Sequence, residues 1–131
     1  MAYTTIDDPS AYFQTKLYTG TGNSLALTND GNSDLQPDWV WVKCRDDSHN
    51  HQVFDSVRGV HKRMRTDTDG AETESSESLK SFNTDGFTLG TQANVNNSGN
   101  TFVAWNWKKT ATAGFDIVSY TGNATARTIS H

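Results

Sequence analysis

The sequence predicts an all-β fold, an antiparallel β-sandwich with little helix, and three observations support this prediction. Hydrophobic residues make up only 34% of the 131 residues, which is low for a helical bundle or a parallel α/β fold. Aromatic residues, at 11%, are too frequent for a disordered chain. Short runs rich in β-branched and aromatic residues alternate with clusters of Asn, Asp, Gly and Ser, as strands alternate with turns. The length suits one domain.

The first strong strand signal is the run 37–45, which reads Pro-Asp-Trp-Val-Trp-Val-Lys-Cys-Arg. Successive side chains of a strand point to opposite faces of its sheet. Two sets therefore separate here: Trp39, Trp41 and Lys43 on one face, and Val40, Val42 and Cys44 on the other. Both faces begin with apolar residues, which predicts an inner strand.

Residues 51–57 and 77–82 are the next strand candidates. The second of them runs into Asn83-Thr-Asp-Gly86, a turn signal, and residues 87–90 follow as another short strand. An Asp-Gly pair between two β-prone runs predicts a hairpin. Residues 72–80 carry only a weak helix signal, because Ser and Thr dominate and no apolar stripe of period 3.6 appears.

A polar loop over residues 92–100 precedes the last strong strand, residues 101–108. Alternation divides that strand into two sets: Val103, Trp105 and Trp107 on one face, and Phe102, Ala104 and Asn106 on the other. Large aromatic side chains on central strands are usually buried. We therefore expect the tryptophans to belong to the core rather than to an exposed platform for sugar rings: Trp39, Trp41, Trp105 and Trp107.

One segment of the chain is echoed 102 residues later. Residues 13–20 and residues 115–122 both read Phe, four variable residues, then Tyr-Thr-Gly. Coincidence in a chain rich in Thr and Gly is one interpretation; a domain-sized repeat is the other, and the one we favour. The expected organisation is an N-terminal arm (1–12), a β-sandwich domain (13–114), and a final segment (115–131) that starts a second repeat-like unit or links to a further fibre domain.

A loop near the first strong strand gathers two carboxylates and two imidazoles: Asp46, Asp47, His49 and His51. Such ligands suit divalent ions. No metal-binding motif that would supply further ligands accompanies this loop, however, so a solvated turn is the favoured interpretation. We predict neither a metal nor a cofactor.

A basic run that contains Arg58, Lys62 and Arg63 is followed by acidic residues over 67–77. One interpretation is a contact with an anion. The favoured interpretation is a protruding hairpin or loop whose basic and acidic arms partly neutralise each other, because adjacent acids weaken the field that basic residues present to an anion within a Debye length of about 8–10 Å. The net charge of −4 gives no reason to expect nucleic acid as a partner.

Catalytic patterns are not apparent, and we expect no enzyme. The sequence holds no Gly-x-Ser-x-Gly motif, and Cys44 falls on an apolar strand face, which predicts an inert thiol. The available acids show no spacing that singles out a glycosidase pair: Asp46, Asp47, Asp55 and Asp85. No apolar run approaches the roughly 18–20 residues of a membrane span, so we expect no membrane insertion.

Five blocks of the chain, taken together and in this order, resemble the virion appendage proteins of tailed bacteriophages, especially marine and cyanobacterial ones: 12–22, 36–43, 54–59, 81–90 and 101–108. The resemblance extends over roughly residues 12–131. It implies a lectin-like sandwich of the concanavalin A or jelly-roll type, often repeated or joined to further fibre domains. It brings no catalytic or binding residue with it.

The resemblance implies a structural protein of the phage particle, a tail fibre or similar appendage used in host attachment, made in the host cytoplasm and located in the virion. Because the chain begins at Met1, we expect its domain to be the particle-proximal one. The implied partners are other virion proteins of tail or capsid, and two further copies in a homotrimer. The alternative is a lectin-like carbohydrate-binding module that contacts host-surface glycan directly.

Overall fold

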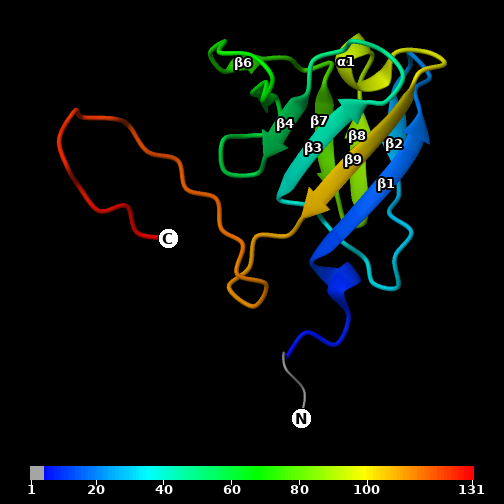
Figure 1. Ribbon diagram of the computed structural model, residues 1–131. Coiled ribbons are helices and arrows are strands. Elements are labelled where there is room, and N and C mark those ends of the chain that lie inside the picture. Colours follow the sequence, from blue (N-terminus) through cyan, green and yellow to red (C-terminus); the bar gives the residue numbers. More distant parts are fainter. Residues whose placement is uncertain (1–4) are drawn as a thin grey trace.

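The computed structural model describes residues 5–131 and forms two antiparallel sheets packed face to face (Figure 1). The predicted all-β sandwich is therefore confirmed. The elements are a 3-10 turn (Pro9–Ala11), β1 (Phe13–Thr19), β2 (Leu25–Leu27), β3 (Trp39–Cys44), β4 (Gln52–Asp55), β5 (Lys62–Arg63), β6 (Thr73–Glu74), β7 (Leu79–Asn83), β8 (Gly86–Leu89), α1 (Ala93–Asn96) and β9 (Thr101–Trp107).

The larger sheet has the order β1-β9-β3-β4 and the smaller one the order β2-β8-β7, while β5 and β6 form a separate two-stranded sheet. The last strand, β9, lies between β1 and β3, so it joins the two ends of the sandwich domain. It runs antiparallel to β1, with Phe13 opposite Trp107 and Thr19 opposite Thr101. β3 is an inner strand, as predicted, because β9 and β4 flank it.

The core lies between the two sheets. The larger sheet contributes the side chains that alternate with its tryptophans, and the smaller sheet contributes Leu and Phe side chains. The buried residues of this cluster are Tyr18, Leu27, Val40, Val42, Cys44, Phe54, Leu79, Phe87, Leu89, Val95, Phe102 and Ala104. Cys44 is a free thiol buried in this core, on the apolar strand face predicted for it.

The prediction that the tryptophans belong to the core is wrong. All four lie on the outer face of the larger sheet and are only half-buried: Trp39, Trp41, Trp105 and Trp107. The alternation itself was predicted correctly. Both faces of β3 and β9 carry apolar residues, however, and the smaller sheet covers the opposite face, that of Val40 and Phe102.

The hairpin predicted around Asn83 to Gly86 is present as β7 and β8, with these two residues paired at its end. Gly86 has a φ of 101°, and a Cβ there would lie 2.0 Å from the carbonyl oxygen of Leu27, so the turn requires glycine. The predicted loop 92–100 contains the short helix α1, which buries Val95 and Asn96 against the core.

The segment after β9 leaves the sandwich (Figure 1). Thr110 and Phe115 form an isolated bridge, and residues 116–131 belong to no strand. A first strand needs neighbours to satisfy its backbone, and none is offered to residues 116–122 here. The second repeat-like unit, or linker, remains a prediction. Of the N-terminal arm, residues 1–4 lie outside the described residues. Among residues 5–131 no helix is long and apolar enough to cross a membrane.

We expect Phe102→Ala to lower the free energy of unfolding by about 3–5 kcal/mol, because it empties a fully buried site beside Tyr18. The matched control is Leu17→Ala on the neighbouring strand, where the side chain is 58% exposed and the loss should stay below about 1 kcal/mol. Urea denaturation followed by circular dichroism measures both. Equal losses would contradict this assignment of the core face.

Candidate functional site: an aromatic outer face

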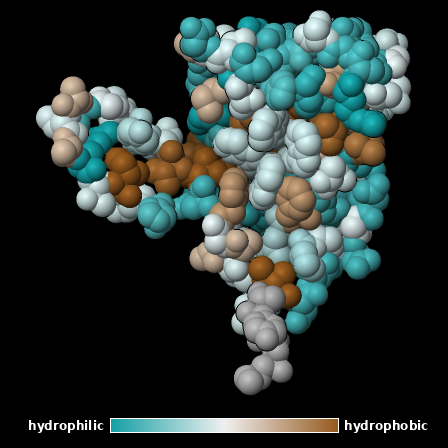
Figure 2. Space-filling model, viewed as in Figure 1, coloured by the Kyte–Doolittle hydropathy of each residue, from teal (hydrophilic) through white to brown (hydrophobic). Residues whose placement is uncertain are grey.

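The outer face of the larger sheet carries an ordered set of aromatic rings, which we call the aromatic face: Phe13, Trp39, Trp41, Trp105 and Trp107. Strand register sets their order. Phe13 lies opposite Trp107 and Trp107 opposite Trp39, and in the next row Trp105 lies opposite Trp41. Figure 2 looks onto this side, where pale and brown residues occupy the centre and hydrophilic residues gather along the upper rim.

The rings pack against one another at an angle. Trp41 and Trp105 are 5.6 Å apart with 59° between their planes, and Phe13 and Trp107 are 4.8 Å apart at 49°. His51 lies beside Trp41, with ring centroids 6.0 Å apart. Tilted pairs of this kind are favourable because the edge of one ring meets the face of the next. The result is a rough, half-exposed apolar surface rather than a flat one.

The C-terminal segment already places one side chain on this surface. Phe115 lies 6.1 Å from Trp107 and 6.2 Å from Trp39, measured between ring centroids. A turn delivers it: Thr110 and Phe115 exchange backbone hydrogen bonds of 2.9 and 3.3 Å, and Gly114 has a φ of 68°. Beyond Phe115, a cavity of about 260 Å³ remains between the tail and the sheet, lined by Trp39 and Met64 among others. The aromatic face therefore accepts an aromatic side chain of a polypeptide.

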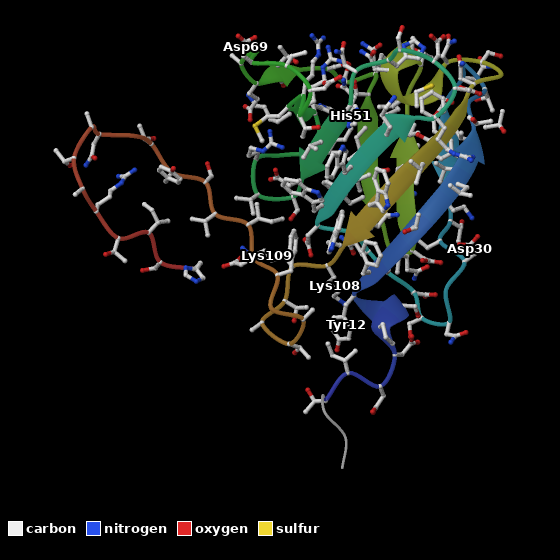
Figure 3. All side chains as sticks on the ribbon, viewed as in Figure 1. Tyr12, Asp30, His51, Asp69, Lys108 and Lys109 are labelled. Carbon is white, nitrogen blue, oxygen red and sulfur yellow. The ribbon has the colours of Figure 1, made fainter. Side chains whose placement is uncertain are left out.

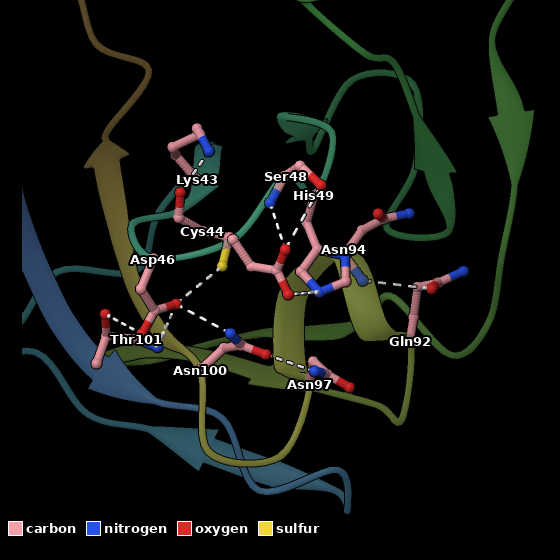
Figure 4. A network of polar contacts seen from close by, with 11 residues as sticks. Lys43, Cys44, Asp46, Ser48, His49, Gln92, Asn94, Asn97, Asn100 and Thr101 are labelled. Atoms are coloured by element: carbon pink, nitrogen blue, oxygen red, sulfur yellow. Dashed lines mark hydrogen bonds and ion pairs between the residues drawn. The ribbon is translucent and has the colours of Figure 1, made fainter.

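Asp46, one of the loop candidates, connects the end of β3 to the start of β9 (Figure 4). Its carboxylate accepts hydrogen bonds from the backbone N–H and the hydroxyl of Thr101, both at 2.9 Å, and from the Asn100 amide at 3.0 Å. These bonds, that of the Thr101 backbone first, hold the pKa of Asp46 well below its ordinary value of 3.8. Asp46 is thus a structural anchor.

The other members of that loop make local contacts. Asp47 accepts a hydrogen bond from the Ser48 N–H at 2.7 Å, and its carboxylate lies 3.9 Å from Nε2 of His49. The backbone N–H of His51 donates to Asp67 at 3.2 Å. Within residues 5–131, no three His, Cys, Asp or Glu side chains are grouped so as to hold a metal ion. The arrangement fits a turn between two strands.

Arg58, from the basic run, pairs with a buried acid. The Asp55 carboxylate is 1% exposed and accepts from Nε of Arg58 at 2.5 Å and from the backbone N–H groups of Val57 and Arg58. Arg58 also donates to Glu72 at 2.9 Å. This ion pair holds the loop after β4 against the sheet.

Lys62 and Arg63 form β5, which pairs with Thr73 and Glu74 of β6. Nζ of Lys62 lies 3.5 Å from the Glu74 carboxylate, and Nε of Arg63 donates to the Thr73 hydroxyl at 3.0 Å. This is the hairpin of paired basic and acidic arms that the sequence favoured. Figure 3 shows Asp69 at its outer end, well away from Lys108 and Lys109 at the other end of the sheet. The charged groups of Lys62 and Arg63 therefore have partners within the fold.

Sequence reasoning missed the aromatic face as a surface and missed Phe115 as part of it. Two signals were available. Lys43 shares its strand face with Trp39 and Trp41, and a charged side chain marks the solvent side of a sheet. Phe115 begins the echoed segment, and its counterpart Phe13 lies on the same tryptophan, Trp107.

A family model described as a domain of unknown function (DUF7483) matches residues 8–131. No curated protein and no solved structure matches the chain.

Stability should depend on the ionised form of Asp46. Because its pKa is lowered in the folded state, the stabilisation is complete above its unfolded pKa and is lost as pH falls from about pH 5. We expect Asp46→Asn to lower the melting temperature at pH 7 and to flatten its decline between pH 5 and pH 2. Asp47→Asn, which changes only contacts within its own turn, should lower the melting temperature less at pH 7. An unchanged acid profile in Asp46→Asn would refute this role.

Arg58→Met should cost about 3–5 kcal/mol of unfolding free energy, because it leaves the buried Asp55 carboxylate without its counter-ion. Lys62→Met is the matched control: the Lys62 side chain is 41% exposed, and loss of its charge should cost less than about 1 kcal/mol. Urea denaturation of both variants gives the comparison, and a small effect of Arg58→Met would show that the pair contributes little.

Proposed function

The chain belongs to the DUF7483 family, and we propose that it is a structural, non-catalytic module of a tailed-bacteriophage appendage, such as a tail fibre used in host attachment. Its place would be the virion, after synthesis in the host cytoplasm. The ordered sequence blocks that resemble such appendages support this proposal, and so does a β-sandwich whose loops are built from neutral turn residues and internally paired charges.

The observation that carries a structural role is the seating of Phe115 on the aromatic face. Tryptophan and phenylalanine are enriched where proteins contact one another, and tryptophan often contributes most of the binding energy there. Here half-exposed tryptophans lie side by side, and a polypeptide side chain occupies only one end of the surface. Around Trp41 and Trp105, where His51 lies beside Trp41, the half-buried rings can pack against a further subunit. The partners we propose are two copies of this chain in a homotrimer and neighbouring virion proteins.

A non-catalytic role agrees with the use that the fold makes of its acids. Hydrolysis of a glycan commonly needs two carboxyl groups placed across a cleft. Asp46 holds the start of β9, and Asp55 is buried against Arg58. Asp85 accepts a hydrogen bond from the Leu35 N–H. Each of these carboxylates therefore has a structural role.

Direct binding of host glycan is the second candidate, because half-exposed indole rings on an outer sheet face can stack on sugar rings. The tilt of 59° between Trp41 and Trp105 favours the first candidate. Two rings at that angle offer no common plane to a sugar, whereas side chains of another protein can interdigitate with them. If the chain binds to a glycan array, and if Trp105→Ala abolishes this binding without unfolding the protein, glycan binding becomes the first candidate.

We expect the full chain to form a trimer at micromolar concentration, and Trp105→Ala to raise the dissociation constant by at least about 30-fold, as for a truncated interface tryptophan. Val57→Ala is the control, since Val57 is 41% exposed but lies in the loop after β4. Sedimentation equilibrium measures the masses. A chain that stays monomeric at every concentration would argue against the homotrimer.

Location in the particle is a separate test of the same proposal. Antibodies raised against the chain should label the appendages of purified phage particles in electron micrographs. If the antibodies detect the protein in the lysate but leave the particles unlabelled, the proposed virion role is wrong.

A further inference from the structure

We propose that the edge of β9 that holds β1 is a strand-acceptor site, and that residues 115–122 are a second ligand for it. The ligand class is an extended peptide with Phe, four variable residues, then Tyr-Thr-Gly. This inference goes beyond the proposed function and does not depend on it. The site makes three demands on β1.

The first two requirements concern aromatic rings. Phe13 lies 4.8 Å from Trp107 at one end of the strand pair. Tyr18 is nearly buried: its ring stacks on Phe102 at 5.2 Å, and its hydroxyl donates to the Val95 carbonyl at 2.7 Å. A side chain at this position must therefore be aromatic and must carry a hydrogen-bond donor at its tip.

The third requirement is steric. A Cβ on Gly20 would lie 2.2 Å from the carbonyl oxygen of Asn97, which is far closer than atoms can approach. The backbone at this point also bonds to its surroundings: Gly20 donates to the Asn100 carbonyl at 2.8 Å and accepts from the Gly99 N–H at 2.9 Å. Only glycine fits here.

The echoed segment repeats these three residues at the same spacing, as Phe115, Tyr120 and Gly122. In the tail, neither the packing around Tyr18 nor the steric limit at Gly20 has a counterpart at Tyr120 or Gly122. Tyr120 is 65% exposed, and no atom lies within 4 Å of a Cβ built on Gly122. Abundance of Thr and Gly explains a chance match anywhere along a strand. It does not explain a match at the positions where the site is selective.

The chain path also suits the exchange. β1 runs antiparallel to β9, with Phe13 opposite Trp107. The turn at 110–115 already reverses the chain after β9 and returns Phe115 to Trp107. If residues 115–121 paired with β9 in the register of β1, residues 108–114 would form the loop of a hairpin. Hairpin loops of this length are feasible, since closure costs rise slowly with length.

Gln14 explains why β1 holds the site in this structure. Its amide donates to the Ser10 and Ser33 carbonyls at 2.9 and 2.8 Å and accepts from the Gly31 N–H at 2.7 Å. The tail has Asp116 at this position, and an ionised carboxylate cannot donate. The tail is therefore the weaker ligand, and it should enter the site when β1 is weakened. The entering tail can come from the same chain or from a second copy.

Four full-length chains test this competition: wild type, Tyr18→Ala, Tyr120→Ala and the double variant. We expect Tyr120→Ala alone to leave the melting temperature unchanged. In the Tyr18→Ala background the same change should lower it by a further 8 °C or more, roughly the effect of losing one or two kcal/mol in a domain of this size. The two tyrosines would then be coupled although they lie on different segments. Additive effects would overturn the proposal.

A disulfide trap covers the case in which Tyr18→Ala does not fold stably. Leu17 lies opposite Val103, and Ser119 is its counterpart in the tail. Val103→Cys with Ser119→Cys should crosslink under mild oxidation when the milder Tyr18→Phe is also present, because that change keeps the buried ring and removes only the hydrogen bond to the Val95 carbonyl. Val103→Cys with Ile117→Cys, two residues out of register, is the control. The native thiol Cys44 is buried on the other face of the sheet.

The mass of the crosslinked product identifies the source of the tail. A crosslinked monomer means that the chain's own tail fills the site, and a crosslinked dimer means that a second copy supplies it; both support the acceptor site. Absence of the crosslink, or equal yields from the two cysteine pairs, would falsify it. Neither result bears on whether the chain resides in a phage particle.

Discussion

β9 is hydrogen-bonded along both of its edges, to β1 from Thr101 to Trp107 and to β3 from Phe102 to Trp107. These two ladders bring together segments from opposite ends of the chain, and they place the alternating side chains of all three strands in common rows. One face of the rows carries Tyr18, Val42 and Phe102; the other carries the aromatic face. The core, the outer surface and the position of the tail all follow from this arrangement.

A four-stranded sheet with two apolar faces needs a layer of protein on each face, and the described residues supply a full layer on one of them. The sheet β2-β8-β7 packs on the inner face, whereas on the outer face Phe115 packs on Trp39 and Trp107, and His51 lies beside Trp41. Exposed apolar surface is costly in water, so a surface of this kind is retained where something packs on it. The assembly role that we propose therefore uses the aromatic face and not the charged loops, whose ions are paired within the fold.

Charge pairing in this fold serves to hold loops. Asp46 anchors the start of β9, Asp55 and Arg58 hold the loop after β4, and Lys62 and Glu74 close the small hairpin beside it. Such groups resemble ligand or catalytic residues in a sequence, because their types and clustering are the same. Their partners distinguish them: Arg58 lies close to Asp55 along the chain, whereas Thr101, the partner of Asp46, lies on a distant segment.

Local pattern alone determined several features of this protein: the alternating faces of the runs around Trp39 and Trp105, the Asn83–Gly86 hairpin, and the opposite charges that pair across β5 and β6. Each of these depends on residues close in sequence, or on a period of two that any strand imposes. Only the tertiary structure decided which apolar face became the core, that Asn96 and Val95 are buried by a short helix, and that Phe115 returns to Trp107. The physical reason is that alternation defines two faces without ranking them, and burial is settled by whichever distant segment packs on one of them.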